Sequence, residues 1–545
     1  MDPLRVIGFS LLALLPSVGA AQTALDLADP SLAREAGSVS SQAGFPVQQE
    51  QNASLPDVPE GGPYEMVAGA ILVQGSTVLP QSLFSADVER FLGRPLDRRD
   101  LSELAGAIAA TARRKGYGLS TAWVPAQSLN NGILIVRLEE GAIADVRASG
   151  SGAAIAAARL SGLAKGNAVA TRALERAWLI ARDIPGMTVG EMRLARSSGS
   201  NILEVDAKYD RFQSSVSLDN WGNDVVGPLQ AYFDVNVGSL MSAGDRLTLN
   251  VATNPTRPEE LQLARISYSF LPDVQGTSIY ISGYVAATQP GGALRQLDYA
   301  GKSGEIRVGV SRPLLRSRAE SLWLGFDAAR RWSTLKLDDT IIRRDEVTSA
   351  AAWLYGIREL AGIRTRANFV VTQGLDLGRT TAGGDPRASR PNADGVFTRV
   401  YASASFQGKL EERVNLEIGT IAQIASSPLL LVEELGLGGR AYLRAFDYRE
   451  ASGTRGAAAM AEIRYDLPKP LSGVRWAQLF GFVDGGKVSA TAGYPSSWLS
   501  SAGGGLRIWT DHRLETELIF AAPLTLGADG RKSNPRVSFV VTKRL

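Results

Sequence analysis

The amino-acid sequence predicts two α/β domains followed by a 16-stranded antiparallel transmembrane β-barrel. Three observations lead to this fold class. Residues 64–210 pass nearly twice through the same order of strands and helices, which predicts two related soluble domains. Residues 211–545 repeat an amphipathic strand pattern, with apolar side chains on one face and polar or charged ones on the other. The connections between these strands alternate between short and long, as in bacterial barrels.

The chain begins with a predicted signal peptide over residues 1–21. Arg5 precedes an apolar run of about ten residues, and small residues follow where a signal peptidase would cut. That run is shorter than the ~20 residues of a spanning helix. Residues 22–63, rich in Ala, Ser, Gln and Pro, are predicted to be a linker, with a short helix over 30–37 as a candidate plug of the pore.

The first α/β domain is expected over residues 64–141. Its elements are predicted as a strand over 66–73, helices over 81–92 and 100–115, and strands over 119–124 and 132–139. The second helix carries an apolar stripe, as a core-facing helix requires, made of Leu101, Leu104, Ile108 and Ala112.

The second α/β domain is expected over residues 142–210. It contains a predicted helix over 171–182, and the sequence Ile184-Pro185-Gly186 breaks the chain after it. Strands are expected near 187–195 and 201–208.

The barrel is expected over residues 211–545. One alternating segment would also suit a soluble β-sandwich, but the repetition along the whole region favours a barrel with a polar lumen. We predict sixteen strands, beginning near 211, 228, 245, 259, 275, 301, 318, 341, 361, 394, 411, 456, 473, 501, 513 and 535. If the soluble domains lie in the periplasm, every long connection falls on the external side, including the longest one, 426–455.

Asp484 is the most informative residue of the barrel wall. It shares a strand face with Phe482, and a carboxylate in a membrane wall is costly unless it points into a wet lumen and meets a partner. Arg444, in the long 426–455 segment, is the candidate partner. The alternative is that Asp484 lies in a turn and Arg444 is a solvated loop charge.

Composition argues against several functions. Lys+Arg (58) nearly balances Asp+Glu (55) without a concentrated basic run, so no nucleic-acid partner is expected. Cysteine is absent, and the single histidine, His512, lies in a polar turn. No nucleophile–base set and no phosphate-binding glycine loop is visible. The sequence therefore predicts no catalytic residues, cofactor or metal, and an outer-membrane protease or lipase is disfavoured.

Several short motifs follow one another in an order that resembles the two-partner secretion transporters, the haemolysin- and filamentous-haemagglutinin-exporting branch of the Omp85 superfamily. The likeness covers nearly the whole chain after the predicted signal peptide. The motifs are Leu92-Gly93-Arg94-Pro95-Leu96, Lys115-Gly116-Tyr117, Trp123-Val124-Pro125-Ala126-Gln127, Leu138-Glu139-Glu140-Gly141, Asp183-Ile184-Pro185-Gly186, Ser217-Leu218-Asp219-Asn220-Trp221-Gly222 and Gly244-Asp245.

The resemblance implies that the soluble domains are POTRA domains and that 426–455 is a sixth loop folded back into the lumen. It implies a loop–lumen lock, in which Arg444 and Phe446 of the loop meet Phe482, Asp484 and Gly485 of the wall. Two departures stand out. Ala445 replaces the motif glycine, so a positive φ there would be strained. Leu545 replaces the usual C-terminal aromatic, although it stays on the apolar strand face.

The resemblance also implies a function. The chain would lie in the bacterial outer membrane as a monomer, with its POTRA domains in the periplasm. It would secrete one large exoprotein of the adhesin or haemolysin type, in extended form, through its pore. Membrane lipid and, during biogenesis, the barrel assembly machinery would be its other partners. The alternative is an outer-membrane protein assembly and insertion factor of the same superfamily.

Overall fold

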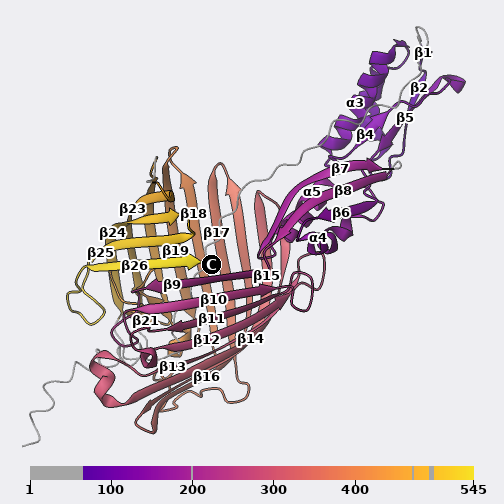
Figure 1. Ribbon diagram of the computed structural model, residues 1–545. Helices are drawn as coiled ribbons and strands as arrows, with labels where there is room; N and C mark the ends of the chain where they lie inside the picture. The colour runs from indigo at the N-terminus through magenta and orange to yellow at the C-terminus, as the bar shows by residue number, and fades with distance from the viewer. Residues whose placement is uncertain (1–65, 198–199, 469–471, 490–495) are drawn as a thin grey trace, which may run out of the picture.

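The computed structural model describes residues 66–545 except 198–199, 469–471 and 490–495. The predicted signal peptide, linker and plug helix lie outside the described residues. Two small α/β domains form an arm that extends from one end of a β-barrel, and the second of them touches the barrel (Figure 1). Among the described residues, no helix is both long and apolar enough to cross a membrane.

The first α/β domain contains a three-stranded sheet in the order β2-β5-β4 and a strand pair β1–β3. Its elements are β1 (Met66–Val67), β2 (Ala70–Gln74), η2 (Gln81–Phe84), α2 (Ser85–Glu89), β3 (Pro95–Leu96), α3 (Arg98–Arg114), β4 (Thr121–Trp123), η3 (Asn130–Gly132) and β5 (Ile133–Glu139). Asp97 caps α3 in a capping box with Asp100, and Leu104 and Ile108 of the predicted stripe are fully buried. The helix expected over 81–92 is a 3-10 turn followed by one short helix.

Glu140 closes the first domain by binding the turn after β2. Its carboxylate accepts hydrogen bonds from the amides of Thr77, Val78 and Leu79 and from the hydroxyls of Ser76 and Thr77. Burial opposes the charge of this group, but the hydrogen bonds from Thr77, Val78 and Leu79 outweigh that effect and lower the pKa of Glu140. Through Glu140, the Leu-Glu-Glu-Gly motif thus stabilises the fold of this domain.

We expect Glu140→Gln to lower the free energy of unfolding of this domain by about 2–3 kcal/mol at neutral pH, because bonds to a charged acceptor are lost. Since the folded pKa is depressed, the stabilisation is complete above the unfolded value of about 4.3 and is lost as the pH falls through the folded value. Hydrogen exchange of α3 amides between pH 7 and pH 3 measures this. A Glu140→Gln variant that loses stability with acid as steeply as the native chain would contradict it.

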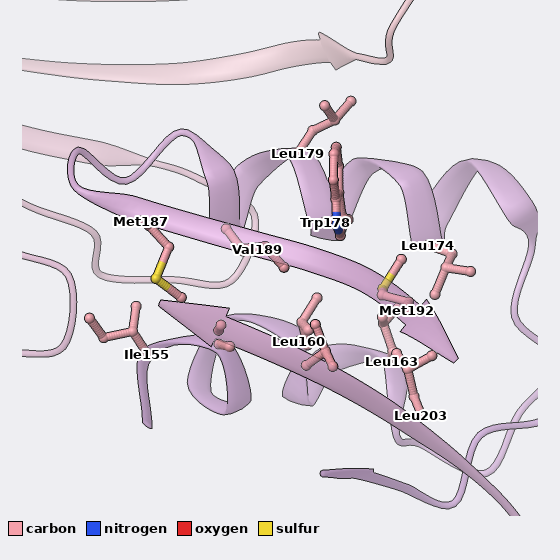
Figure 2. Packing of buried hydrophobic residues seen from close by; sticks show 14 of the residues in the cluster. Ile155, Leu160, Leu163, Leu174, Trp178, Leu179, Met187, Val189, Met192 and Leu203 are labelled. Carbon is pink, nitrogen blue, oxygen red and sulfur yellow. The ribbon is translucent and has the colours of Figure 1, made fainter. Parts of the chain in front are cut away.

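The second α/β domain repeats the arrangement with a sheet in the order β6-β8-β7. Its elements are β6 (Asp145–Ser149), α4 (Ala153–Leu160), η4 (Ser161–Leu163), α5 (Thr171–Arg182), β7 (Met187–Ser197) and β8 (Ser200–Tyr209). Figure 2 shows its core, where Leu174 and Trp178 of α5 pack together with Ile155, Leu160 and Leu163 of α4 and η4 and with the strands of the sheet. The indole N–H of Trp178 donates to the carbonyl of Gly190 in β7 at 3.0 Å. Helix α4 was not predicted.

The rest of the chain closes into the predicted barrel of sixteen antiparallel strands (Figure 1). The strands are β9 (Phe212–Asp219), β10 (Gln230–Gly238), β11 (Arg246–Thr253), β12 (Gln262–Phe270), β13 (Ser278–Thr288), β14 (Tyr299–Arg316), β15 (Glu320–Leu337), β16 (Thr340–Leu360), β17 (Ile363–Leu375), β18 (Thr398–Lys409), β19 (Val414–Ala425), β22 (Gly456–Asp466), β23 (Val474–Val488), β24 (Ser497–Thr510), β25 (Leu514–Pro523) and β26 (Arg536–Arg544). Each begins within a few residues of its predicted start.

The two faces of the barrel wall differ as predicted. Large apolar side chains such as Ile281, Ile306 and Phe326 are exposed on the outside, where lipid would cover them. Charged side chains such as Glu305 and Glu462 are buried on the inside. Strand β26 meets β9 over only five residue pairs, from Val540 with Asp219 to Arg544 with Ser215, and this seam closes the cylinder.

Candidate functional site

The predicted sixth loop, residues 426–455, lies inside the barrel against the wall. It contains η7 (Leu431–Glu433) and a short hairpin of β20 (Leu435–Leu437) with β21 (Ala451–Gly453). We call residues 431–437 and 449–454 the stem, and residues 440–448 the tip. Leu443, Ala445 and Phe446 of the tip belong to one apolar cluster with Phe480 and Phe482 of β23, so the tip is packed against the lumen wall.

Arg444 reaches the wall at two carboxylates. Its Nη1 atom lies 2.5 Å from Oε2 of Glu462 in β22, and its Nε atom lies 3.9 Å from Oδ2 of Asp484 in β23. Its backbone amide donates to the same Asp484 oxygen at 3.3 Å, and its guanidinium stacks 4.2 Å from the ring centre of Phe482. The hydroxyl of Ser501 donates to the other oxygen of Asp484. The structure therefore brings Arg444, Phe482 and Asp484 together.

Phe446 and the motif glycines have distinct places. Phe446 is buried, and its amide donates to the carbonyl of Leu443 in the turn of the tip. Gly485 is open enough for an added Cβ to make ordinary contacts, whereas a Cβ at Gly486 would lie 2.8 Å from Ala458 and 3.1 Å from Leu437 of the loop. Gly486, rather than Gly485, is the glycine that lets the loop approach the wall.

The left-handed backbone that would strain Ala445 lies at other residues of the loop. Left-handed φ angles occur at Leu443 (61°) and Arg449 (56°) of the loop, and Ala445 is not among the described residues with positive φ. An alanine at this position therefore carries no left-handed backbone strain. The turn places its αL residue one step before Arg444.

Glu462, which the sequence analysis did not single out, is the main ionic partner of Arg444. Its other oxygen binds Arg464 at 2.6 Å and Arg507 at 2.8 Å, and its side chain is fully buried. Arg507 continues to Glu517, which also binds Arg440 of the tip at 2.6 Å. A buried carboxylate needs such partners, and this network holds two tip arginines at the wall. The available signal was the alternation of Glu462 and Arg464 on one strand face.

The motif at residues 217–222, at the start of the barrel, contacts the seam between β9 and β26. The side-chain amide of Asn220 donates to the carbonyl of Val537, and its oxygen accepts from the amide of Phe539, so it extends the short ladder between β9 and β26. Trp221 is buried in the same apolar cluster as the tip. Arg536 stacks on Trp221 at 5.2 Å and binds Asp447 of the tip at 2.5 Å. The tip therefore contacts both the wall and the seam.

The second α/β domain is fixed to three turns of the barrel. Arg159 of α4 donates to the carbonyls of Ala243 (2.9 Å), Leu271 (3.1 Å) and Asp273 (2.6 Å). Asp183, in the Asp-Ile-Pro-Gly motif, forms an ion pair with Arg316 at 2.5 Å. These contacts place the arm at the end of the barrel that carries the short turns, which is the predicted periplasmic end.

We expect Arg159→Ala to loosen the arm, because three carbonyls lose a charged donor at a cost of about 2–4 kcal/mol. Cysteines placed at the exposed residues Lys165 and Glu320 in this cysteine-free chain allow spin labels to report the distance between arm and barrel. The distance distribution should broaden in Arg159→Ala. The exposed Arg172→Ala on α5 is the control and should leave it unchanged; equal distributions in both variants would contradict the role of Arg159.

A sixteen-stranded barrel with an inward-folded loop and a two-domain periplasmic arm defines an outer-membrane protein transporter. Residues 198–508 match the family model described as haemolysin secretion/activation protein ShlB/FhaC/HecB, and residues 69–141 match the POTRA domain of ShlB type. The chain belongs to this secretion/activation family. The predicted family, fold class and localisation are confirmed: the chain is a two-partner secretion transporter of the outer membrane, with POTRA domains in the periplasm.

Known proteins agree with this assignment. The heme/hemopexin transporter protein HuxB of Haemophilus influenzae is 25% identical over 408 residues, which cover 72% of this chain and 71% of HuxB. The solved structure of CdiB from Escherichia coli superposes with a TM-score of 0.72 at 20% identity, covering 98% of this chain and all of that one. CdiB from Acinetobacter baumannii gives 0.64 at 18% identity, with coverages of 92% and 95%. The two structures support the fold.

The predicted function is confirmed as export of a large exoprotein. The family is one of transporters rather than enzymes. Its members pair with large exoproteins.

Proposed function

We propose that the sixth loop is the resting-state closure of the export pore and that Arg444 with Glu462 and Asp484 is its lock. The observation that carries this proposal is the tip itself: a loop that connects two external strand ends runs back into the lumen and buries Arg444 against the wall. A client crossing the lumen has to displace the tip. Phe446, Phe482 and Gly486 give the tip its apolar seat, which makes the closed position specific.

The client enters as an extended chain from the POTRA arm. Among the described residues, each POTRA sheet ends in strands that pair on one side only, and β7 is such an edge strand of 11 residues. An extended segment can pair with such an edge through main-chain hydrogen bonds, which give affinity without strict sequence demands. The short POTRA 1 edge strand β4 offers a second, smaller site. Folding of the client outside the cell drives export in one direction. The proposal includes no cofactor and no catalytic residue.

The barrel works as a monomer surrounded by lipid. Its exposed apolar side chains form the outer face that lipid covers. The barrel assembly machinery would receive it through its last strand, where Leu545 and Val537 are both exposed. The proposal includes no nucleic acid, because lumenal arginines such as Arg331, Arg444 and Arg507 are paired with carboxylates.

Site-specific cross-linking during secretion tests the route. A photo-reactive amino acid at Ser349, which lines a cavity in the lumen, should capture a long exoprotein; one at Ile306, on the outer face, should not. Barrel precursors captured at the β9–β26 seam, in place of an exoprotein in the lumen, would instead support assembly of other barrels.

A further inference from the structure

The stem of the sixth loop is anchored separately from the tip. Glu433 lies between Arg331 of β15 at 2.9 Å and Arg399 of β18 at 2.7 Å, both on a different part of the wall from the tip's partners. Gln423 of β19 donates to the carbonyls of Glu433 (3.0 Å) and Thr454 (3.3 Å), so it ties the two legs of the loop to one strand.

The next residue, Glu434, joins the stem to another external loop. Arg390, in the segment between β17 and β18, binds Glu434 with two parallel hydrogen bonds of 2.9 and 2.7 Å, and Ser452 of β21 donates to the same carboxylate at 2.9 Å. The two ionic side chains are 2% and 1% exposed. A bidentate ion pair that is this deeply buried has a fixed geometry. Separating its two side chains would leave both charges without a partner and without water.

The segment that carries Arg390 is itself held by the wall. The amide of Arg344 in β16 donates to the carbonyl of Arg387 at 2.7 Å, and the amide of Ser389 donates to Asp345 at 2.9 Å. The stem returns a contact, because the amide of Leu431 donates to the hydroxyl of Ser389 at 2.9 Å. The stem is therefore linked to β15, β16, β18 and β19.

Between stem and tip the backbone changes character. Gly438 and Gly439 have consecutive positive φ angles of 112° and 104°. Such angles suit glycine alone, and a glycine pair resists rotation less than other residues do. Two tip contacts are also more exposed than those of the stem, since the side chains of Arg440 and Asp447 are 39% and 42% exposed.

We infer that Glu433 and Glu434 are positioning residues for export: they keep the stem in place while the tip alone swings about Gly438 and Gly439. This inference rests on the proposed lock function of the loop and adds which part of the loop moves. The client then passes beside a stationary stem. The ion pairs of the stem therefore stay formed during export, whereas those of the tip break.

Two disulfide locks in this cysteine-free chain test these two expectations separately. The stem lock is Ser389→Cys with Leu431→Cys. The tip lock is Ala445→Cys with Ser501→Cys, where the amide of Ala445 lies 3.4 Å from the Ser501 hydroxyl. In each pair the amide of one residue contacts the side-chain hydroxyl of the other, and a gel shift of the oxidised variant verifies that the disulfide forms. Export of the exoprotein is measured before and after oxidation, and the reduced form of each variant is its own reference.

We expect the oxidised stem lock to export within about twofold of its reduced form, and the oxidised tip lock to lose at least about tenfold until reductant is added. A blocked stem lock would overturn the stationary stem and leave the loop displacement intact. An active tip lock would instead overturn the proposed loop displacement. The two failures are distinguishable because each lock has its own reference.

Resting ion conductance in planar bilayers gives a second readout. The double variant Glu433→Gln/Glu434→Gln releases the stem and should raise conductance about twofold or more, while heat-modifiable migration of the barrel stays native. The control Glu359→Gln removes a carboxylate from an exposed wall pair with Arg364 and should leave conductance unchanged. Equal conductance of the double variant and this control would overturn the positioning role.

Discussion

Replacing Arg444 by alanine should lower secretion of the exoprotein at least about tenfold while the barrel still inserts into the membrane. The substitution leaves Glu462 and Asp484 buried without the guanidinium that joins them, and breaking a buried pair from one side typically costs about 3–5 kcal/mol. The tip then loses the single closed position from which a client displaces it, and it occupies several positions in the client path instead. Glu462 keeps Arg464 and Arg507, so the wall itself remains intact. Secretion assays with parallel heat-modifiability of the barrel measure both effects.

The contacts of Arg444 predict the order in which substitutions at this site reduce secretion. Glu462→Gln should approach the effect of Arg444→Ala, because it removes the 2.5 Å ion pair. Asp484→Ala should reduce secretion less, since the nearest guanidinium atom is 3.9 Å away. Arg444→Lys should be intermediate, because an ammonium cannot stack flat on Phe482. Arg364→Ala, in an exposed pair, is the control. Native secretion by Arg444→Ala would remove the lock from the mechanism.

Replacing Trp178 by alanine should destabilise POTRA 2 by about 3–5 kcal/mol, the range for deleting a large aromatic side chain from a core. Trp178 is 2% exposed, and its indole also bonds to Gly190, so both a cavity and an unpaired carbonyl result. Because domains of this size have little stability in reserve, much of POTRA 2 should open. Limited proteolysis of the intact transporter should then cut within 145–209, while the barrel stays resistant.

Arg182→Ala is the matched control for this change. Its guanidinium lies 4.3 Å from the centre of the Trp178 ring, and losing such a contact costs about 1 kcal/mol. Proteolysis of Arg182→Ala should therefore stay close to native. If Trp178→Ala resisted protease as well as Arg182→Ala does, the core in Figure 2 would not depend on this side chain.

Local patterns in the sequence were sufficient for most elements. The alternation around Glu462 and Arg464 predicted a strand beginning at 456, and β22 begins there. The stripe with Leu104 and Ile108 predicted α3, whose capping box is also a local signal. Helix α4 was missed because it is short, follows Gly152 and has no side-chain cap, so its existence depends on packing against β6 and β8.

Some features of the candidate site could also be predicted from the sequence, and others depended on the tertiary structure. Sequence alone determined that the wall alternates between lipid and lumen, that Asp484 faces inward with Phe482, and that an arginine in a long external loop was available to meet it. Only the tertiary structure decided that Arg444 pairs mainly with Glu462, that Gly486 is the glycine under the loop, and that Glu433 and Glu434 hold the stem. The physical reason is register: Glu462 stands opposite Phe482, two residues from Asp484, only because β22 and β23 pair in one alignment. Spacing along one chain carries no information about that alignment.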